Sequence, residues 1–430
     1  MSAARRRPSD GSLTLVLRPP AGPLLGLAFT ARTVAATLPI TLLLALADRY
    51  GYARAALVGG GHTLVLAFLV PLRGRLLDRY GHRHALPVMA AVAMTLTALA
   101  AVSVTARWPW WTTLFLVITA SISGPPLNAA LRSAWRRLVD PQHLKTVHTA
   151  DSVLEEAGFV AAPLAAGTAV TLLGAVTAYQ TAAACYLLTM ALYLAAARHW
   201  GLSPALPPAA PARGRAAGRA HRWLGPLAQP RILMIMGPLL VMGCLFGGTG
   251  IYVPAYSQAQ HATAQIGPLL ATISAGGVIG GLLYAVLPTR RIPPWTLYRL
   301  LTAGFALPGC FLLLAHQPLV LAVLLLLSGL FVTPLFITAF LLLDATATDD
   351  VRVEANTWVG ASTDISNGIT AIAIGALTAG QHFHTALAVL SACAAGGLLT
   401  ALLLTPPPQP AAAPDHAAQP GPGSEVPAGP

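Results

Sequence analysis

Charged residues are scarce in this 430-residue chain: Asp, Glu, Lys and Arg make up 9% of it, and hydrophobic residues make up 55%. A soluble globular protein carries roughly 25% charged residues, because its surface must face water. So low a charged fraction excludes a water-facing surface for most of the chain. It predicts instead an integral membrane protein, with hydrocarbon around most of its residues.

Acidic residues are fewer than basic ones, 14 against 26, which gives a formal net charge of +12. A basic surplus can indicate nucleic-acid binding. Here, however, the basic residues lie in short clusters between apolar runs, which is typical of signals for membrane topology. We therefore predict contact with a lipid bilayer and no nucleic-acid partner.

Groups that could hold a metal are also few. The four cysteines lie far apart inside apolar runs, without a C-x-x-C spacing: Cys185, Cys244, Cys310 and Cys393. His382 and His384 form a pair with no acidic partner nearby. The sequence therefore predicts no metal site, no cofactor and no membrane enzyme.

Long apolar runs dominate what remains. A membrane-spanning helix needs about 20 mostly apolar residues. On that basis we predict twelve transmembrane helices, an all-α fold, over residues 22–47, 52–71, 85–106, 110–132, 148–172, 175–197, 231–255, 265–288, 295–315, 318–343, 355–379 and 383–404. The run 22–47 is too long for the apolar region of a cleaved signal peptide, so we expect it to remain as the first span.

The segment 198–230, rich in proline and arginine, divides these spans six and six. The predicted organisation is therefore a tail, a six-helix bundle, a flexible linker, a second six-helix bundle and a disordered tail: residues 1–21, 22–197, 198–230, 231–404 and 405–430. The halves also resemble each other weakly. The fifth and eleventh spans both begin polar and acidic, and the second and eighth both carry glycine clusters, as in transporters built from repeats.

Orientation follows from the excess of basic residues in cytoplasmic loops. With both termini in the cytoplasm, 22 of the 26 Lys and Arg residues fall on that side, and Arg49, Arg54 and Arg107 fall outside. If one helix had been missed, every later loop would be assigned to the wrong side of the membrane, and this charge asymmetry would be lost. We therefore predict a multi-pass protein of the cytoplasmic membrane.

The loop after the second predicted span carries a motif, Gly74-Arg75-Leu76-Leu77-Asp78-Arg79-Tyr80-Gly81-His82-Arg83. It resembles the G-x-x-x-D-R-x-G-[RK]-[RK] signature of the major facilitator superfamily at Gly74, Asp78, Arg79, Gly81 and Arg83, with His82 in place of one basic residue. The resemblance implies a secondary transporter of two six-helix bundles, with this loop joining the bundles as a cytoplasmic gate.

Asp48-Arg49-Tyr50-Gly51 repeats part of the motif on the external side, and we assign it no role. The segment 151–167 resembles only slightly the fifth-helix motif of proton-driven drug exporters.

A charge inside a span costs several kcal/mol unless it is paired or hydrated, so it is a candidate for function. Four such residues lie at similar predicted depths: Arg32, Glu155, Glu156 and Asp364. We hypothesise that Arg32 pairs with Glu155 or Glu156, that one of these glutamates carries a proton, and that Asp364 faces them from the other bundle. A static salt bridge between the first and fifth spans is an equally good interpretation. Asp151 is expected to cap its helix.

Further candidates carry no charge. Asn128 and Asn367 are predicted to face the cavity, and Gly250, Tyr252 and Pro254 are predicted to form an outer gate, with interfacial anchoring as the alternative for the tyrosine.

Buried acids, an apolar cavity and few sugar-binding side chains near the midplane favour proton-coupled efflux of a small, largely apolar molecule. We expect the transporter to be a monomer. An importer or facilitator of a small metabolite on the same fold is the alternative. A sensor without transport activity would need a soluble domain, and 198–230 is too short for one.

Overall fold

The computed structural model describes residues 21–80, 82–124, 139, 144–200, 229–287, 291–346 and 352–404, and the regular structure within them is helical. Its helices are α2 (Ala21–Tyr50), α3 (Tyr52–Tyr80), α4 (His82–Thr105), α5 (Trp110–Ser123), α7 (Leu144–Leu173), α8 (Ala175–His199), α10 (Pro230–Ala259), η3 (Thr263–Gln265), α11 (Ile266–Val286), α12 (Pro294–Cys310), η5 (Leu312–Leu314), α13 (Pro318–Gly329), α14 (Val332–Thr346), α15 (Arg352–Ala379) and α16 (Phe383–Leu403).

These helices correspond to the twelve predicted spans. Among the described residues, ten helical stretches are long and apolar enough to cross a membrane, with α13 and α14 together making one of them. The other two spans are α5, which is short over its described residues, and α15, which is long but more polar. The linker residues 201–228 and the tails before residue 21 and after residue 404 lie outside the described residues.

The outward faces of these helices are apolar. Val286 is 78% exposed, Leu172 is 76% exposed and Leu402 is 74% exposed. A helix that is apolar both inside and outside is typical of a membrane span, because lipid tails solvate the outer side chains.

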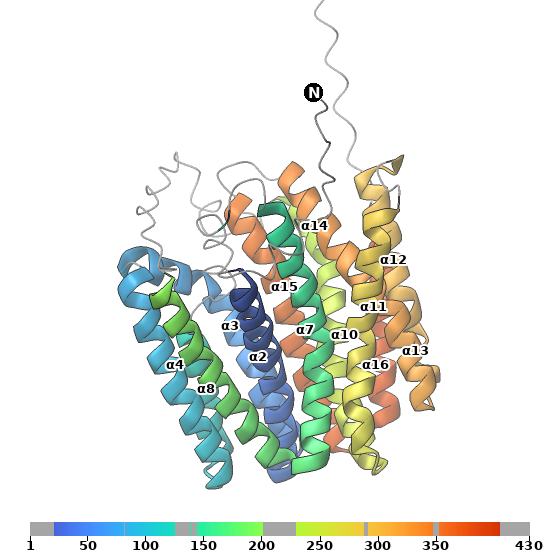
Figure 1. Ribbon diagram of the computed structural model, residues 1–430. Coiled ribbons are helices and arrows are strands. Elements are labelled where there is room, and N and C mark those ends of the chain that lie inside the picture. The colour runs from blue at the N-terminus through green and yellow to red at the C-terminus, as the bar shows by residue number, and fades with distance from the viewer. Residues whose placement is uncertain are drawn as a thin grey trace, which may run out of the picture.

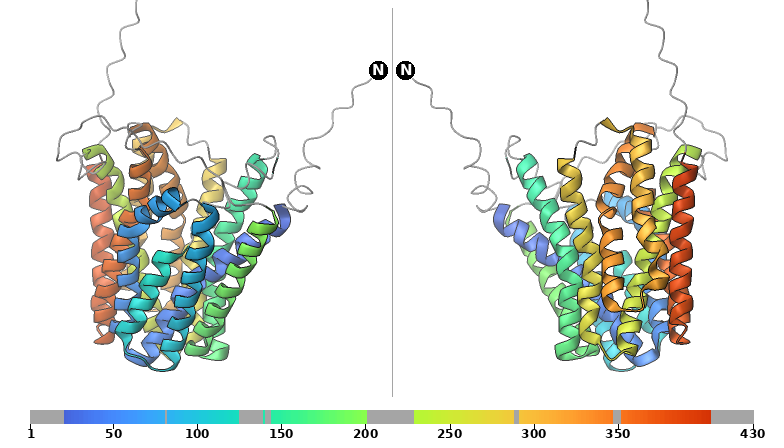
Figure 2. Two further views of the ribbon diagram at one scale, coloured as in Figure 1. Left: turned by 90° about the vertical axis from the view of Figure 1, so that its left-hand side faces the viewer. Right: turned by 90° about the vertical axis from the view of Figure 1, so that its right-hand side faces the viewer.

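The helices form two bundles, α2 to α8 and α10 to α16 (Figures 1 and 2). In the first bundle α2 packs between α7 and α8, and in the second α10 packs against α15 and α16. The bundles meet along two pairs, α3 with α15 and α7 with α11. These are the second and eleventh, and the fifth and eighth, spans. Exchanging the two halves converts one pair into the other, which is the relation expected of a duplicated transporter.

Glycines bring the bundles into backbone contact near the predicted external end, which carries the turn between α2 and α3. A Cβ atom on Gly60 would lie 2.6 Å from the carbonyl oxygen of Gly368, and one on Gly167 would lie 2.6 Å from the backbone of Gly267. At Gly360, two turns before Gly368 on α15, a Cβ atom would meet nothing within 4 Å. The backbone contact of α15 with α3 therefore lies in the external half of α15.

Candidate functional site

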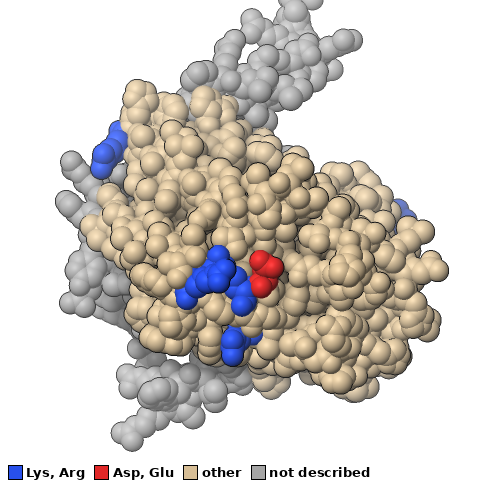
Figure 3. Space-filling view, turned by 90° about the horizontal axis from the view of Figure 1, so that it is seen from below, with Lys and Arg blue, Asp and Glu red and all other residues tan. Residues whose placement is uncertain are grey.

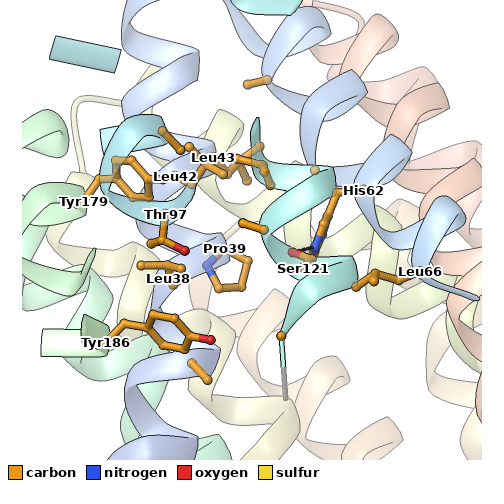
Figure 4. Close-up of a pocket in the computed structure, with 17 residues that line it drawn as sticks. Leu38, Pro39, Leu42, Leu43, His62, Leu66, Thr97, Ser121, Tyr179 and Tyr186 are labelled. Atoms are coloured by element: carbon orange, nitrogen blue, oxygen red, sulfur yellow. Dashed lines mark hydrogen bonds between the residues drawn. The ribbon is translucent and has the colours of Figure 1, made fainter. Parts of the chain in front are cut away.

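A cavity of about 270 Å³ lies inside the first bundle (Figure 4). Its wall on α2 consists of Ala35, Leu38, Pro39, Leu42 and Leu43, which the helical repeat places on neighbouring faces of the helix. Residues of α3, α4, α5 and α8 complete the lining. Ligand pockets span roughly 300–1,000 Å³, so this cavity lies just below that range and suits only a very small molecule.

The cavity lining is mainly apolar, with a few polar groups. His62 on α3 and Ser121 on α5 face each other and share a hydrogen bond, drawn dashed in Figure 4. Thr97, Tyr179 and Tyr186 contribute hydroxyl groups to the lining. None of the lining residues is Asp, Glu, Lys or Arg. Such a site fits a small neutral or weakly polar molecule that makes one or two hydrogen bonds.

A buried ion pair joins α2 to α7, outside the lining of this cavity. The Arg32 guanidinium donates from Nη1 to Asp151 Oδ1 at 2.8 Å and from Nη2 to Oδ2 at 3.2 Å. Nη1 also donates to the Asp151 carbonyl oxygen at 3.2 Å. The side chains are 10% and 2% exposed. Bidentate geometry of this kind fixes both side chains firmly. Arg32 lies one turn before Ala35 on α2, at the predicted cytoplasmic end of the cavity.

This pair corrects the interpretation of Asp151 as a helix cap. The helix begins at Leu144, not near residue 148, so Asp151 lies two turns into it and points into the protein. The partner predicted for Arg32 was Glu155 or Glu156, whereas the ion pair in the structure uses Asp151. Glu155 follows one turn later on the same side of α7, which explains why the two acids were hard to distinguish.

Close packing surrounds the ion pair. A Cβ atom on Gly158 would lie 3.2 Å from Thr33 Oγ1, and Thr37 donates to the Ala162 carbonyl oxygen at 3.4 Å. The Thr33 hydroxyl is buried without a hydrogen-bond partner among the described groups. Small residues on α7 therefore allow α2 to approach closely, and the ion pair holds the two helices together.

Glu156 and Asp364 occupy equivalent places in the two bundles. Glu156 precedes Gly167 by eleven residues, and Asp364 precedes Gly375 by eleven residues; each of these glycines contacts the opposite bundle. Eleven residues are about three helical turns, so each acid shares a face with its glycine. Gly167 packs on α11, and Gly375 packs on Ala56 of α3. Both half-buried carboxylates therefore lie on faces directed at the opposite bundle. Each lies about 16 Å from its glycine, toward the predicted cytoplasmic end.

The structure places the other predicted residues as follows. Residues 74–80 belong to α3 and residues 82–83 to α4, but the side chains of residues 70–86, the whole of Gly81 and Asn128 lie outside the described part. The Asn367 backbone packs against Gly247 of α10. The motif's role as a gate and the cavity role of both asparagines therefore remain predictions.

Tyr252 of the predicted outer gate packs against aromatic side chains, and the gate role of Gly250, Tyr252 and Pro254 remains a prediction. Tyr252 is 2% exposed, stacks on Tyr256 at 5.6 Å between ring centroids, and meets Phe383 of α16 edge-on at 6.1 Å. These contacts lie within the second bundle. The contact between bundles at this end comes from glycines, for which no gate role was predicted. The cluster Gly59-Gly60-Gly61 was the available signal.

The residue pattern of the major facilitator superfamily matches residues 24–347 of the chain. The chain belongs to this superfamily. No curated protein is detectably similar to it in sequence. As a major facilitator it is a membrane-embedded secondary transporter of small molecules and not an enzyme.

Solved structures share the fold of this major facilitator at low sequence identity. The nucleoside transporter NupG is 12% identical with a TM-score of 0.66, over 89% of this chain and 98% of that one. A bacterial homologue of the iron transporter ferroportin in its inward-facing state is 15% identical with a TM-score of 0.69, over 89% and 97%. The peptide transporter POT in complex with sulfate is 14% identical with a TM-score of 0.65, over 89% and 92%. At these identities the likeness concerns the fold alone.

Proposed function

We propose that this major facilitator exports a small, largely apolar molecule across the cytoplasmic membrane in exchange for protons. The observation that carries the proposal is the equivalent placement of Glu156 and Asp364 on the faces that the two bundles direct at each other. Ionisable groups inside a membrane are costly and mark ion pathways or relays. A carboxylate from each bundle provides two places where a proton can be held between the bundles.

The coupling follows from how a carboxylate responds to its surroundings. Its proton affinity rises when water is excluded and falls when a cation approaches. Rocking of the bundles changes the hydration of Glu156 and Asp364 together, because both lie on the faces that separate. On this mechanism the acids take protons from the external side and release them to the cytoplasm as substrate moves outward.

Arg32 and Asp151 have a different role in this proposal. Their ion pair lies between two helices of one bundle, so it maintains the shape of that bundle during rocking. The cavity in the same bundle, with apolar walls and the His62–Ser121 pair, is the proposed first contact for substrate.

Transport of apolar fluorescent dyes into inside-out membrane vesicles tests this function. An imposed proton gradient, acidic inside, should drive dye accumulation by the wild-type chain, and Glu156→Gln and Asp364→Asn should each reduce it at least tenfold. Asp48→Asn, which neutralises an exposed acid at the end of α2, is the matched control and should transport normally. Gradient-driven uptake in right-side-out vesicles instead would establish the importer alternative. Full accumulation by both variants would remove the proton-carrier role.

A further inference from the structure

A membrane-facing groove runs between α4 and α8. It has a volume of about 420 Å³ and is lined by Ala98, Ala101, Val102, Thr105, Ala106, Gln180, Ala183, Ala184 and Leu187. Small side chains leave a hollow here, while neighbouring positions such as Leu188 (60% exposed) project outward. Exposed leucines indicate that this surface faces hydrocarbon, so the molecules that can enter the groove are those of the bilayer.

The external end of the groove is polar and built by hydrogen bonds. Gln180 Nε2 donates to Thr105 Oγ1 at 2.6 Å, and Arg49 Nη1 donates to the Thr105 carbonyl oxygen at 3.2 Å. Tyr50 donates its hydroxyl to the carbonyl oxygen of Trp108. The Gln180 bond holds the end of α4 to α8, and the bonds from Arg49 and Tyr50 hold it against the turn between α2 and α3. Arg49 therefore lies at the head of the groove.

A basic patch surrounds this end. Arg107 follows the groove residue Ala106 directly, and its backbone is left-handed with φ of 57°, which is uncommon for arginine. Arg54 is exposed in the first turn of α3. Figure 3 looks onto this face and shows basic side chains gathered beside an acidic one. Among the described residues, Arg49, Arg54 and Arg107 form no ion pair, and Asp48 is the one exposed acid of this turn.

We propose that this rim binds an anionic phospholipid, with the phosphate on Arg49 and Arg107 and one acyl chain in the groove between α4 and α8. Charge complementarity selects the headgroup, because arginine side chains match phosphate oxygens well. The adjoining apolar groove, open to the hydrocarbon, selects a lipid over a soluble anion. The site is separate from the cavity and from the acids of the transport mechanism.

Native mass spectrometry of the full chain in detergent, with added phosphatidylglycerol or phosphatidylcholine of identical acyl chains, tests the proposal. The wild-type chain should retain phosphatidylglycerol preferentially. Each arginine near an anionic lipid is worth about a fivefold change in affinity, so Arg49→Gln with Arg107→Gln should weaken binding by about 25-fold. Arg198→Gln, at the opposite end of α8, removes one arginine charge outside the rim and should retain wild-type affinity.

A second pair of variants tests the groove without changing charge. Ala184→Phe fills the groove and should reduce phosphatidylglycerol retention, whereas Leu188→Phe, on the same helix but outside the lining, should not. Equal retention of both lipids by the wild-type chain would overturn the proposal, as would unchanged retention in the double arginine variant. Full displacement of the lipid by inorganic phosphate, together with normal retention by Ala184→Phe, would also overturn it, because the arginines would then bind phosphate alone.

Discussion

At the scale of single residues, the Arg32–Asp151 pair is the strongest polar contact described between α2 and α7. Removing one partner of a buried ion pair leaves an uncompensated charge and costs about 3–5 kcal/mol. Asp151→Asn and Arg32→Gln should therefore each lower the thermal unfolding midpoint of the purified protein clearly. The double variant should be less damaged than the two single effects predict, because it leaves no isolated charge.

A double-mutant cycle on unfolding midpoints in detergent measures this coupling. Arg198→Gln, an exposed arginine at the end of α8, should leave the midpoint unchanged. Strict additivity of the two single substitutions would show that the pair contributes nothing as a pair.

The cavity also permits a test with one residue. Gly59 lines it, and a Cβ atom there would meet nothing within 4 Å, so Gly59→Leu should fit and occupy the space. We expect dye transport to fall severalfold with little change in the unfolding midpoint. Gly396→Leu on α16 is the matched control, because Gly396 is exposed, has nothing within 4 Å and lies outside the cavity. Normal transport by Gly59→Leu would mean that substrate does not use this cavity.

The sequence identified Arg32 and the acids of α7 as buried candidates, but it could not assign the partner of Arg32. Starting the helix four residues too late placed Asp151 in the first turn, where a cap is the natural interpretation. Asp151 and Glu155 lie on one face, so helical periodicity alone cannot choose between them. The rotation of α2 against α7 decides it, and that depends on Gly158 and Thr33 packing across the interface.

At the scale of helices, the contact between α3 and α15 depends on the absence of side chains. A Cβ atom on Gly368 would lie 2.6 Å from the Gly60 carbonyl oxygen, and backbone atoms cannot move aside cheaply. Gly368→Val should therefore force the helices apart at the predicted external end and reduce transport strongly. Gly360→Val adds the same side chain to the same helix, where nothing lies within 4 Å, and should be tolerated.

Labelling separates an opened interface from simple unfolding. In a variant without native cysteines, Ala56→Cys, at a position with 0% exposure, should react slowly with a membrane-impermeant maleimide. Adding Gly368→Val should raise that rate severalfold, and adding Gly360→Val should not. Unchanged labelling with Gly368→Val would contradict a closing role for this contact.

Hydropathy and loop charge predicted the helices well, including α15, although its polar residues make it less apolar than the other long spans. The interruption between α13 and α14 was not predicted. It lies at Leu330 and Phe331, three to four residues before Pro334. A proline ring clashes with the carbonyl group four residues earlier, here that of Leu330, so the helix restarts with Pro334 in its first turn. The proline was visible in the sequence, but the long apolar run concealed its effect.

At the scale of the whole molecule, the six-plus-six pattern was predictable because each loop's charge constrains the next. The pairing of α3 with α15 and of α7 with α11 was not, since it depends on backbone contacts between residues far apart in sequence. The symmetry between the two halves nevertheless connects the sequence pattern to the structure. It relates the acidic starts of the fifth and eleventh spans, noted in the sequence, to the equivalent positions of Glu156 and Asp364 in the structure.

The orientation of the molecule is a prediction that follows from the whole pattern of loops. Residue 78 follows two spans and residue 212 follows six, so both must lie on the same side of the membrane, while residue 107 follows three and must lie on the other. In a variant without native cysteines, Asp78→Cys and Ala212→Cys should be protected from an impermeant maleimide in intact cells and labelled in inside-out vesicles. Arg107→Cys should show the opposite pattern. Labelling of residues 78 and 212 from opposite sides would mean that an odd number of spans separates them, which would contradict the two-bundle arrangement and the loop-charge argument together.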